Sequence, residues 1–259
     1  MVDRLNILRV QDLVNNPTPR VPVVLCLDTS GSMGAVEDDG TCQSTGETIY
    51  EDGHVWNIVV GGISRISELQ KGIQAFMDEI REDEIAQYSA EVCIVTFNSS
   101  AKCVEDFATV DRQSKLPELE AVGDTHMGEG VNLALDLLEK RKQEYKDKGV
   151  DYYQPWLVLM TDGEANGSES ELQRAITRTC DMINNKKLTI FPIGIGPEAG
   201  MSTLEKFSPK RRPLRLQGLK FKEFFAWLSN SVSRTSQSMP GESVKLDTDA
   251  IRDWGKLEY

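Results

Sequence analysis

The sequence predicts a doubly wound α/β fold, with a mostly parallel sheet, one antiparallel edge strand and helices on both faces. Short apolar runs rich in β-branched residues alternate along the chain with amphipathic segments of helical period. Such alternation requires crossover connections onto a parallel sheet. The length of 259 residues suits one domain of this kind with attachments.

The first predicted strand is the apolar run VPVVLCL at residues 21–27, which is expected to be central and buried on both faces. Two further runs, 91–97 and 101–107, are separated by only three residues. That connection is too short for a parallel crossover, so the two runs should form an antiparallel hairpin at one edge of the sheet. Later strands are expected at 156–160, 188–195 and 214–216.

Four helices are predicted from apolar residues that recur at steps of three and four. They span about 64–81, 127–146, 170–184 and 221–232. Residues 34–62 form a polar insertion with a hairpin over 48–50 and 54–56, around an Asp-Gly turn. The expected organisation is an N-terminal extension (1–20), a domain (21–232) carrying the insertion (34–62), and a weakly periodic C-terminal tail (233–259).

The charge balance argues against two classes of partner. With 29 basic and 41 acidic residues, the formal charge of -12 repels nucleic acid and anionic membrane surfaces. The basic cluster at Lys210, Arg211, Arg212 and Arg215 is interpreted as a solvated loop. No apolar stretch is long enough to span a bilayer, and the first residues do not resemble a secretion signal.

The five cysteines are scattered and lack a C-x-x-C pair. Three of them fall in predicted strands and Cys180 falls on a helix, where a thiol is expected to behave as a small buried hydrophobe. We therefore expect a cytoplasmic protein.

Oxygen-bearing side chains follow two strands and precede one helix. Asp28, Ser30 and Ser32 come directly after the first strand, Asp162 follows the strand at 156–160, and Thr125 precedes the helix at 127–146. The carboxyl ends of parallel strands meet at one edge of such a sheet. Oxygen ligands without sulfur or imidazole select a hard cation. Mg²⁺ is expected, and Mn²⁺ and Ca²⁺ remain alternatives.

Each of these residues is also a common helix cap or turn residue, so the joint placement carries the hypothesis rather than any one motif. Asp124 adds an acidic group at the rim that could compete with or reorient a ligand carboxylate, and His126 is interpreted as a solvated loop residue. The glycines at 194–200 have the wrong spacing for a dinucleotide loop. His54 and His126 are the only histidines, and neither has a catalytic context.

The motifs DTSGS (28–32), the central Thr125 and TDG (161–163) resemble the metal-ion-dependent adhesion site (MIDAS) of von Willebrand factor A domains, over roughly residues 21–232. The resemblance implies a Rossmann-like fold in which Ser30 and Ser32 coordinate the metal directly. Thr125 would bind directly or through water, and Asp28 and Asp162 mainly through water. The implied function is non-enzymatic capture of an Asp or Glu carboxylate from a partner protein.

Within the family, the opening LCLDTSGSM and the strand WLVLMTDGE are most similar to bacterial TerY/YegL-like cytoplasmic proteins. That similarity implies a tellurite-resistance or stress-response system, with a kinase or phosphatase from the same gene cluster as partner. Two alternatives stay open. One is a substrate-presenting partner of an AAA+ ATPase. The other is a Mg²⁺-dependent phosphohydrolase, which Ser30 disfavours because it stands where that chemistry needs an acidic group.

Overall fold

The computed structural model describes residues 12–38, 40–51, 54–113, 115–242, 244, 246–247, 251 and 255–257. Its main sheet has seven strands in the order β11-β10-β9-β8-β1-β6-β7. The strands of this sheet are β1 (Val21–Asp28), β6 (Ala90–Phe97), β7 (Ala101–Thr109), β8 (Trp156–Thr161), β9 (Thr189–Ile195), β10 (Leu214–Leu216) and β11 (Gly255–Leu257). The interior strands pair in parallel, whereas β7 and β11 pair antiparallel to their neighbours. The predicted fold class is confirmed.

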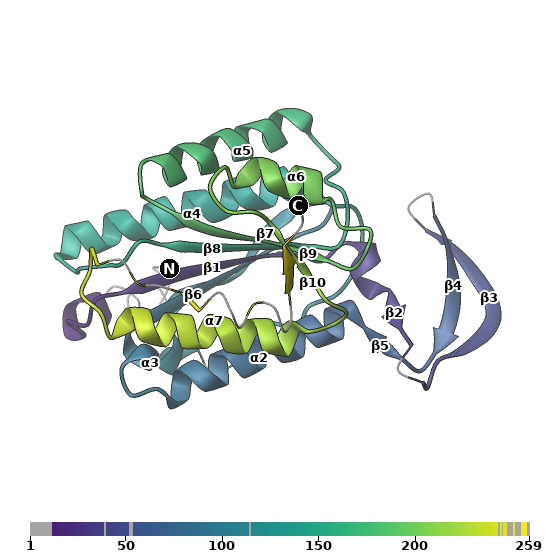
Figure 1. Ribbon diagram of the computed structural model, residues 1–259, viewed down its shortest axis with the longest axis horizontal. Coiled ribbons are helices and arrows are strands. Elements are labelled where there is room, and N and C mark those ends of the chain that lie inside the picture. Colours follow the sequence, from purple (N-terminus) through teal and green to yellow (C-terminus); the bar gives the residue numbers. More distant parts are fainter. Residues whose placement is uncertain are drawn as a thin grey trace, which may run out of the picture.

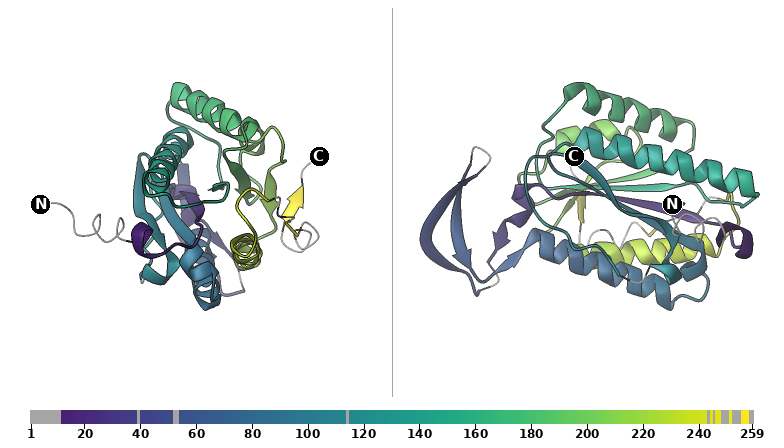
Figure 2. Two further views of the ribbon diagram at one scale, coloured as in Figure 1. Left: turned by 90° about the vertical axis from the view of Figure 1, so that its left-hand side faces the viewer. Right: turned by 180° about the vertical axis from the view of Figure 1, so that it is seen from behind.

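Helices cover both faces of the sheet, as Figures 1 and 2 show, with α4, α5 and α6 on one face and α2, α3 and α7 on the other. The α-helices are α2 (Arg65–Glu82), α3 (Ala86–Ser89), α4 (Met127–Lys148), α5 (Glu169–Asn184), α6 (Met201–Phe207) and α7 (Phe221–Ser236). Two 3₁₀ turns, η1 (Gly31–Gly34) and η2 (Val110–Arg112), follow β1 and β7. All four predicted helices are present, with ends within a few residues of those expected.

The central strand β1 explains how the two layers are joined. Every residue of Val21–Asp28 is buried. Val23, Leu25 and Leu27 belong to the core beneath α2 and α7, whereas Val24 and Cys26 belong to the core beneath α4 and α5. This alternation follows from the two-residue period of a strand. The alternation fixes the register of β1. The register in turn determines where the residues after Leu27 lie at the end of the strand.

The insertion forms an arm that projects from the body, which is best seen in Figure 1. Its base is a short ladder between β2 (Val36–Glu37) and β5 (Ile63–Ser64), and its tip is the hairpin of β3 (Gln43–Glu51) and β4 (His54–Val60). The hairpin is longer than the predicted segments because the pairing continues past a β-bulge between Ser44 and Thr48. The predicted Asp-Gly turn lies outside the described residues.

Two expectations from the sequence need correction. The C-terminal stretch adds β11 to the sheet beside β10, so the sheet has a second antiparallel edge strand. This strand was not predicted, because three residues are too few to show a strand period. Cysteine burial also holds only in part, since Cys26 and Cys93 are buried but Cys103 is exposed and Cys180 is half-buried. Cys103 lies on the edge strand β7, which has one strand neighbour rather than two.

A buried charge network holds the end of the sheet opposite the carboxyl ends of its parallel strands. The carboxylate of Glu91 accepts hydrogen bonds from Arg20 Nε at 3.0 Å, from Arg141 Nε and Nη2 at 2.7 Å each, and from the Tyr145 hydroxyl at 2.6 Å. Burial alone would lower the pKa of Arg141, but the hydrogen bonds and charge of Glu91 raise it above its ordinary value. The network joins β6 to α4 and to the segment before β1.

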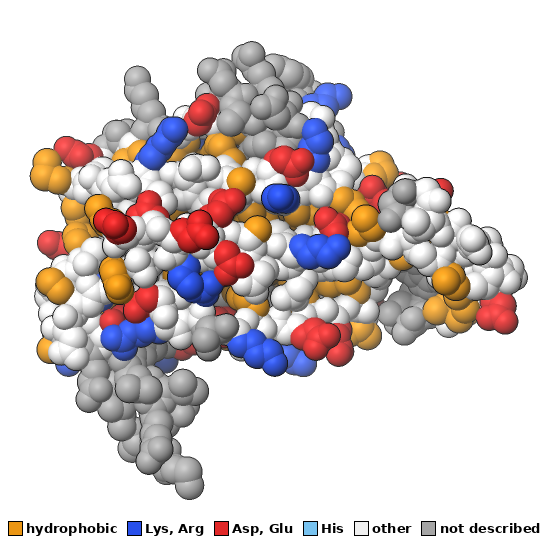
Figure 3. All heavy atoms as spheres, turned by 90° about the horizontal axis from the view of Figure 1, so that it is seen from below, with side chains coloured by type: hydrophobic (Ala, Val, Ile, Leu, Met, Phe, Trp, Pro, Cys, Tyr) orange, Lys and Arg blue, Asp and Glu red, His pale blue; other side chains and the backbone are white. Residues whose placement is uncertain are grey.

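The face that carries α2 and α7 mixes basic and acidic side chains, and apolar side chains are visible on the projecting arm (Figure 3). Within the described residues, no helix has the length and apolar character needed to cross a membrane.

Candidate metal site

A buried carboxylate, that of Asp28, holds the loop after β1 in place through hydrogen bonds. Asp28 is fully buried, and its Oδ1 accepts a hydrogen bond from the Ser30 backbone N–H at 2.8 Å. Its Oδ2 accepts from the Thr161 hydroxyl at the end of β8, at 2.5 Å. The Oγ atoms of Ser30 and Ser32 lie 3.0 Å apart. Asp28 therefore links two neighbouring strands, and the two serine hydroxyls lie close together, as the D-x-S-x-S spacing predicts.

Asp162 completes this cluster from β8. Ser32 Oγ donates to Asp162 Oδ1 at 2.6 Å. On the other side, Arg65 at the start of α2 donates from Nη1 to Asp162 Oδ2 at 2.8 Å. Arg65 is half-buried, and its place beside the site could not be predicted because its neighbour Asp162 is nearly a hundred residues away in sequence.

Thr125 reaches the cluster through a loop held at two points. The Gly31 N–H donates to the Gly123 carbonyl at 2.8 Å, and the Thr125 N–H donates to Asn166 Oδ1 at 2.7 Å. Gly123 has φ of 75°, a left-handed conformation that a side chain would strain, and its position also approaches Ser99 closely. A Cβ at Gly163 would lie 3.8 Å from Thr125 Oγ1 and 3.9 Å from Ser32 Oγ, so both hydroxyls face Gly163.

The five predicted residues thus lie at one edge of the sheet. Hydrogen bonds join Asp28, Ser30, Ser32 and Asp162 into a continuous chain, and the Thr125 hydroxyl, like that of Ser32, lies near Gly163. Sequence reasoning missed Arg65, Thr161 and Asn166, which orient the predicted residues. Of these, only Thr161 carried a sequence signal, because it is part of the TDG motif.

The two carboxylates of the cluster influence each other, and Arg65 already pairs with one of them, Asp162. Burial raises the pKa of Asp28 to about 7, and the nearby negative charge of Asp162 adds to the rise, while hydrogen bonds from Ser30 and Thr161 lower it. A divalent cation beside both carboxylates would offset the cost of their charges. The donor set contains only oxygen, which fits Mg²⁺, Mn²⁺ or Ca²⁺.

Two further residues, Asp124 and His126, lie at the rim of the site, and only His126 differs from expectation. The Asp124 carboxylate accepts a hydrogen bond from Ser99 Oγ at 3.2 Å, and the Asp124 N–H donates to the same oxygen at 2.9 Å. His126 is not simply solvated, because it is half-buried, precedes α4 and lies 3.4 Å from a Glu129 carboxylate oxygen. The two hydrogen bonds with Ser99 therefore attach Asp124 to the turn between β6 and β7.

A cleft of about 760 Å³ lies between the candidate site and the arm. One wall contains Ser30, Ser32 and Thr125, and the other contains Ile49, Val55 and further arm residues. Val55 is 67% exposed and Ile49 is 46% exposed. One wall of the cleft therefore carries polar oxygen atoms, and the facing wall is apolar and accessible.

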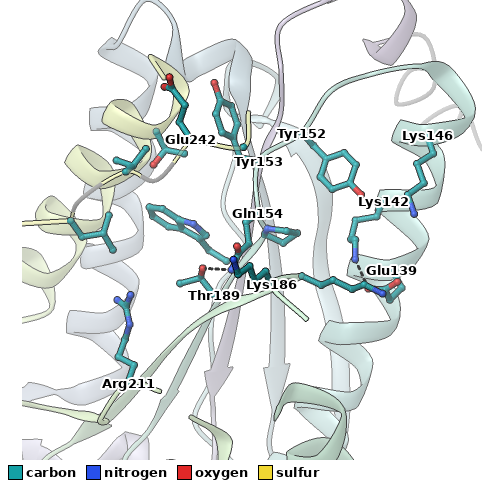
Figure 4. Close-up of a pocket in the computed structure, with 17 residues that line it drawn as sticks. Glu139, Lys142, Lys146, Tyr152, Tyr153, Gln154, Lys186, Thr189, Arg211 and Glu242 are labelled. Atoms are coloured by element: carbon teal, nitrogen blue, oxygen red, sulfur yellow. Dashed lines mark hydrogen bonds and ion pairs between the residues drawn. The ribbon is translucent and has the colours of Figure 1, made fainter. Parts of the chain in front are cut away.

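A second hollow, of about 630 Å³, lies where β8 begins, at the opposite end of the sheet (Figure 4). Lysine and arginine side chains surround it, including Lys186 and Arg211. The buried Lys142 forms an ion pair with Glu139 at 2.6 Å, so its charge is already balanced. This hollow lies away from the carboxyl ends of the strands, where ligands bind in open α/β sheets.

Comparison with known proteins agrees with this arrangement of strands and loops. The family model described as von Willebrand factor type A domain matches residues 23–165, which include all five candidate ligands. The chain belongs to the von Willebrand factor type A family. This is a family of protein-interaction modules that are generally non-enzymatic and often bind a divalent metal. No curated protein sequence matches the chain.

Solved structures show that the fold of this von Willebrand factor A domain is shared widely. A von Willebrand factor type A protein from Catenulispora acidiphila is 18% identical with a TM-score of 0.55, over 84% of this chain and 43% of that chain. BatB from Bacteroides thetaiotaomicron is 16% identical with a TM-score of 0.51, over 84% of this chain and all (100%) of that chain. The pilus adhesin SpaC from Lactobacillus rhamnosus GG, in its open conformation, is 11% identical with a TM-score of 0.58, over 84% and 30%. The chain spans less than two thirds of the Catenulispora and Lactobacillus chains.

Proposed function

We propose that this protein is a non-enzymatic interaction module that binds a divalent cation, Mg²⁺, and through it a carboxylate of a partner protein. The observation that supports the proposal is the hydrogen-bonded chain from Asp28 through Ser30 and Ser32 to Asp162. In this proposal the hydroxyls of Ser30, Ser32 and Thr125 hold the ion, and Asp28 and Asp162 act mainly through water. A cation held largely by neutral oxygens keeps charge available for an outside carboxylate.

The partner segment we propose carries an Asp or Glu flanked by apolar side chains. The carboxylate would meet the oxygen cluster, and the apolar neighbours would contact the arm wall of the cleft, where Ile49 and Val55 are accessible. Burying exposed apolar side chains of this size contributes about 1.5 to 3 kcal/mol each at most. The arm therefore supplies affinity and selection that the ion alone would not.

The wider biological setting is proposed on the resemblance to TerY/YegL-like proteins. There the protein acts in the cytoplasm, in a tellurite-resistance or stress-response system, and its partner is a kinase or phosphatase encoded in the same gene cluster. Neither nucleic acid nor a membrane is expected as a partner, because the chain carries a formal charge of -12.

Affinity purification with and without Mg²⁺ tests the proposal. The full chain should retain acidic-motif partners in Mg²⁺ and release them in EDTA. The double variant Ser30→Ala with Ser32→Ala should keep its fold by circular dichroism and lose the partners. Thr177→Ala, which removes an exposed hydroxyl on α5, is the matched control and should bind as the natural chain does. Partners retained in EDTA and by the double variant would contradict metal-mediated recognition.

A further inference from the structure

A second cluster of metal-binding side chains lies on the edge of the main sheet, between β6 and β7. The Sγ atoms of Cys93 and Cys103 and a carboxylate oxygen of Asp106 all lie within 4.8 Å of one another. Cys93 is buried, Asp106 is half-buried and Cys103 is exposed. The cluster lies in the middle of these strands, whereas the candidate Mg²⁺ site lies beyond the end of β1 and β8.

The pairing of the two strands explains how these residues meet. In a regular strand, residues three apart such as Cys103 and Asp106 point to opposite faces of the sheet. Here the register shifts between Val92 and Ile94 and again between Ile94 and Val95. Val92 pairs with Ala108, Ile94 with Glu105 and Val95 with Cys103, so β7 gains an extra residue at each shift. Two bulges therefore bring Asp106 and Cys103 to the same side as Cys93.

The ligand chemistry of this cluster differs from that of the oxygen site. Two thiolates and one carboxylate suit a thiophilic or borderline ion such as Zn²⁺, and they disfavour Mg²⁺ and Ca²⁺. Tetrahedral Zn²⁺ with Zn–S bonds near 2.3 Å places two sulfur ligands about 3.8 Å apart, so the atoms need to close by about 1 Å or less. Side-chain rotation of the exposed Cys103 supplies a movement of that size.

We propose that Cys93, Cys103 and Asp106 form a Zn²⁺-type binding site, with a fourth position open to water at the sheet edge. On binding, each thiol loses its proton to solvent and its sulfur forms a bond to the metal, so two protons are released per ion. The Cys103 thiol donates a hydrogen bond to the Glu105 carbonyl at 3.5 Å, and metal binding replaces that contact.

Cobalt titration of the reduced, metal-stripped full chain tests the site. Excess Mg²⁺ is included to occupy the oxygen site. Co²⁺ bound by thiolates gives an intense near-ultraviolet charge-transfer band, which oxygen ligands do not produce. We expect this band to appear at one Co²⁺ per chain and to disappear when one equivalent of Zn²⁺ is added.

Substitutions test whether the charge-transfer band arises from this cluster. Cys103→Ser should abolish the band and Asp106→Asn should weaken Co²⁺ binding by about tenfold or more. Both residues are at least partly exposed, so these changes should leave the circular dichroism spectrum unchanged. Cys180→Ser, on α5, is the control and should keep the band. The double variant Ser30→Ala with Ser32→Ala should also keep it, which makes this test independent of the proposed function.

Three results would overturn the site. These are the absence of the band in the reduced natural chain, its persistence in Cys103→Ser, and its loss in Cys180→Ser. A disulfide between Cys93 and Cys103 found by peptide mapping, together with no band after reduction, would show that the pair is a redox couple instead.

Discussion

Arg65 Nη1 lies 2.8 Å from Asp162 Oδ2, so a positive charge from α2 is placed against a carboxylate of the candidate metal site. The other oxygen of this carboxylate accepts from Ser32. Asp162 is therefore held from both sides, and the guanidinium lies next to the cation that we propose.

Replacing this guanidinium should strengthen Mg²⁺ binding. Arg65→Met keeps the apolar stem and removes a charge that repels a divalent cation. We expect Mg²⁺ to bind more tightly on the order of tenfold, or about 1.4 kcal/mol. The gain is no larger because solvent screens much of the repulsion between the guanidinium and the ion. Isothermal titration calorimetry measures the change. Arg174→Met, which removes an exposed arginine on α5, is the control. Weaker binding by Arg65→Met would mean that orientation of Asp162 outweighs charge.

The pH dependence of the metal-free protein should report Asp28. Its pKa is about 7 in the folded chain and near its ordinary value of 3.8 in the unfolded chain. Between these values the folded state holds a proton that the unfolded state has released, so stability falls as pH rises through this interval. Thermal unfolding in EDTA from about pH 5 to about pH 8 should show this fall. Asp28→Asn should remove that part of the pH dependence.

Mg²⁺ should reverse the same trend, because it favours the charged form of Asp28. The stabilisation by Mg²⁺ should therefore grow with pH up to about 7 to 8 and then level off. Equal stabilisation at every pH would argue that Asp28 lies outside the influence of the ion.

The arm wall should contribute to partner binding. Val55→Lys places a charge in the apolar wall of the cleft and should reduce partner capture by about tenfold, because it removes apolar contact worth about 1 to 2 kcal/mol. Val60→Lys is the matched control, since Val60 is 63% exposed against 67% for Val55 and is not part of the cleft wall. Quantified pull-downs in Mg²⁺ compare the two, and equal losses would remove the arm from the binding surface.

The buried charge network should matter for stability and not for metal binding. Glu91→Gln removes the carboxylate that Arg20 and Arg141 share, leaving Arg20 paired with Asp12 and Arg141 paired with the half-buried Glu144. We expect this change to destabilise the fold by about 3 to 5 kcal/mol. Denaturant unfolding measures this. Glu68→Gln, which breaks a pair with the 68% exposed Lys71, should cost less than about 1 kcal/mol. A loss of similar size in both variants would refute a special role for Glu91.

Much of the fold was predictable because its signals are local. The run VPVVLCL, the helical periodicity of α2 and the three-residue connection between β6 and β7 each determine an element within a short stretch of chain. β11 was missed because three residues carry no readable period, and its position depends on β10, about forty residues earlier.

The position of the candidate residues at one edge of the sheet was predictable for a related reason. Asp28, Ser30, Ser32 and Asp162 adjoin strand ends, and Thr125 adjoins a helix start, so fold topology alone places them at one edge. Arg65 and Asn166 were missed because their roles depend on which distant residue they face. The cysteine cluster was missed because regular alternation would have separated Cys103 from Asp106, and bulges are not visible in sequence.

The ladder at the base of the arm has a structural consequence. Val36 pairs with Ser64, and the Arg65 N–H donates to the Ala35 carbonyl at 3.1 Å, so the chain leaves the body and returns to it at adjacent points. A segment with such neighbouring ends can be lengthened, exchanged or deleted while the strands that carry Asp28 and Asp162 stay in place. A change confined to this arm would therefore alter one wall of the cleft and leave the candidate metal site in place.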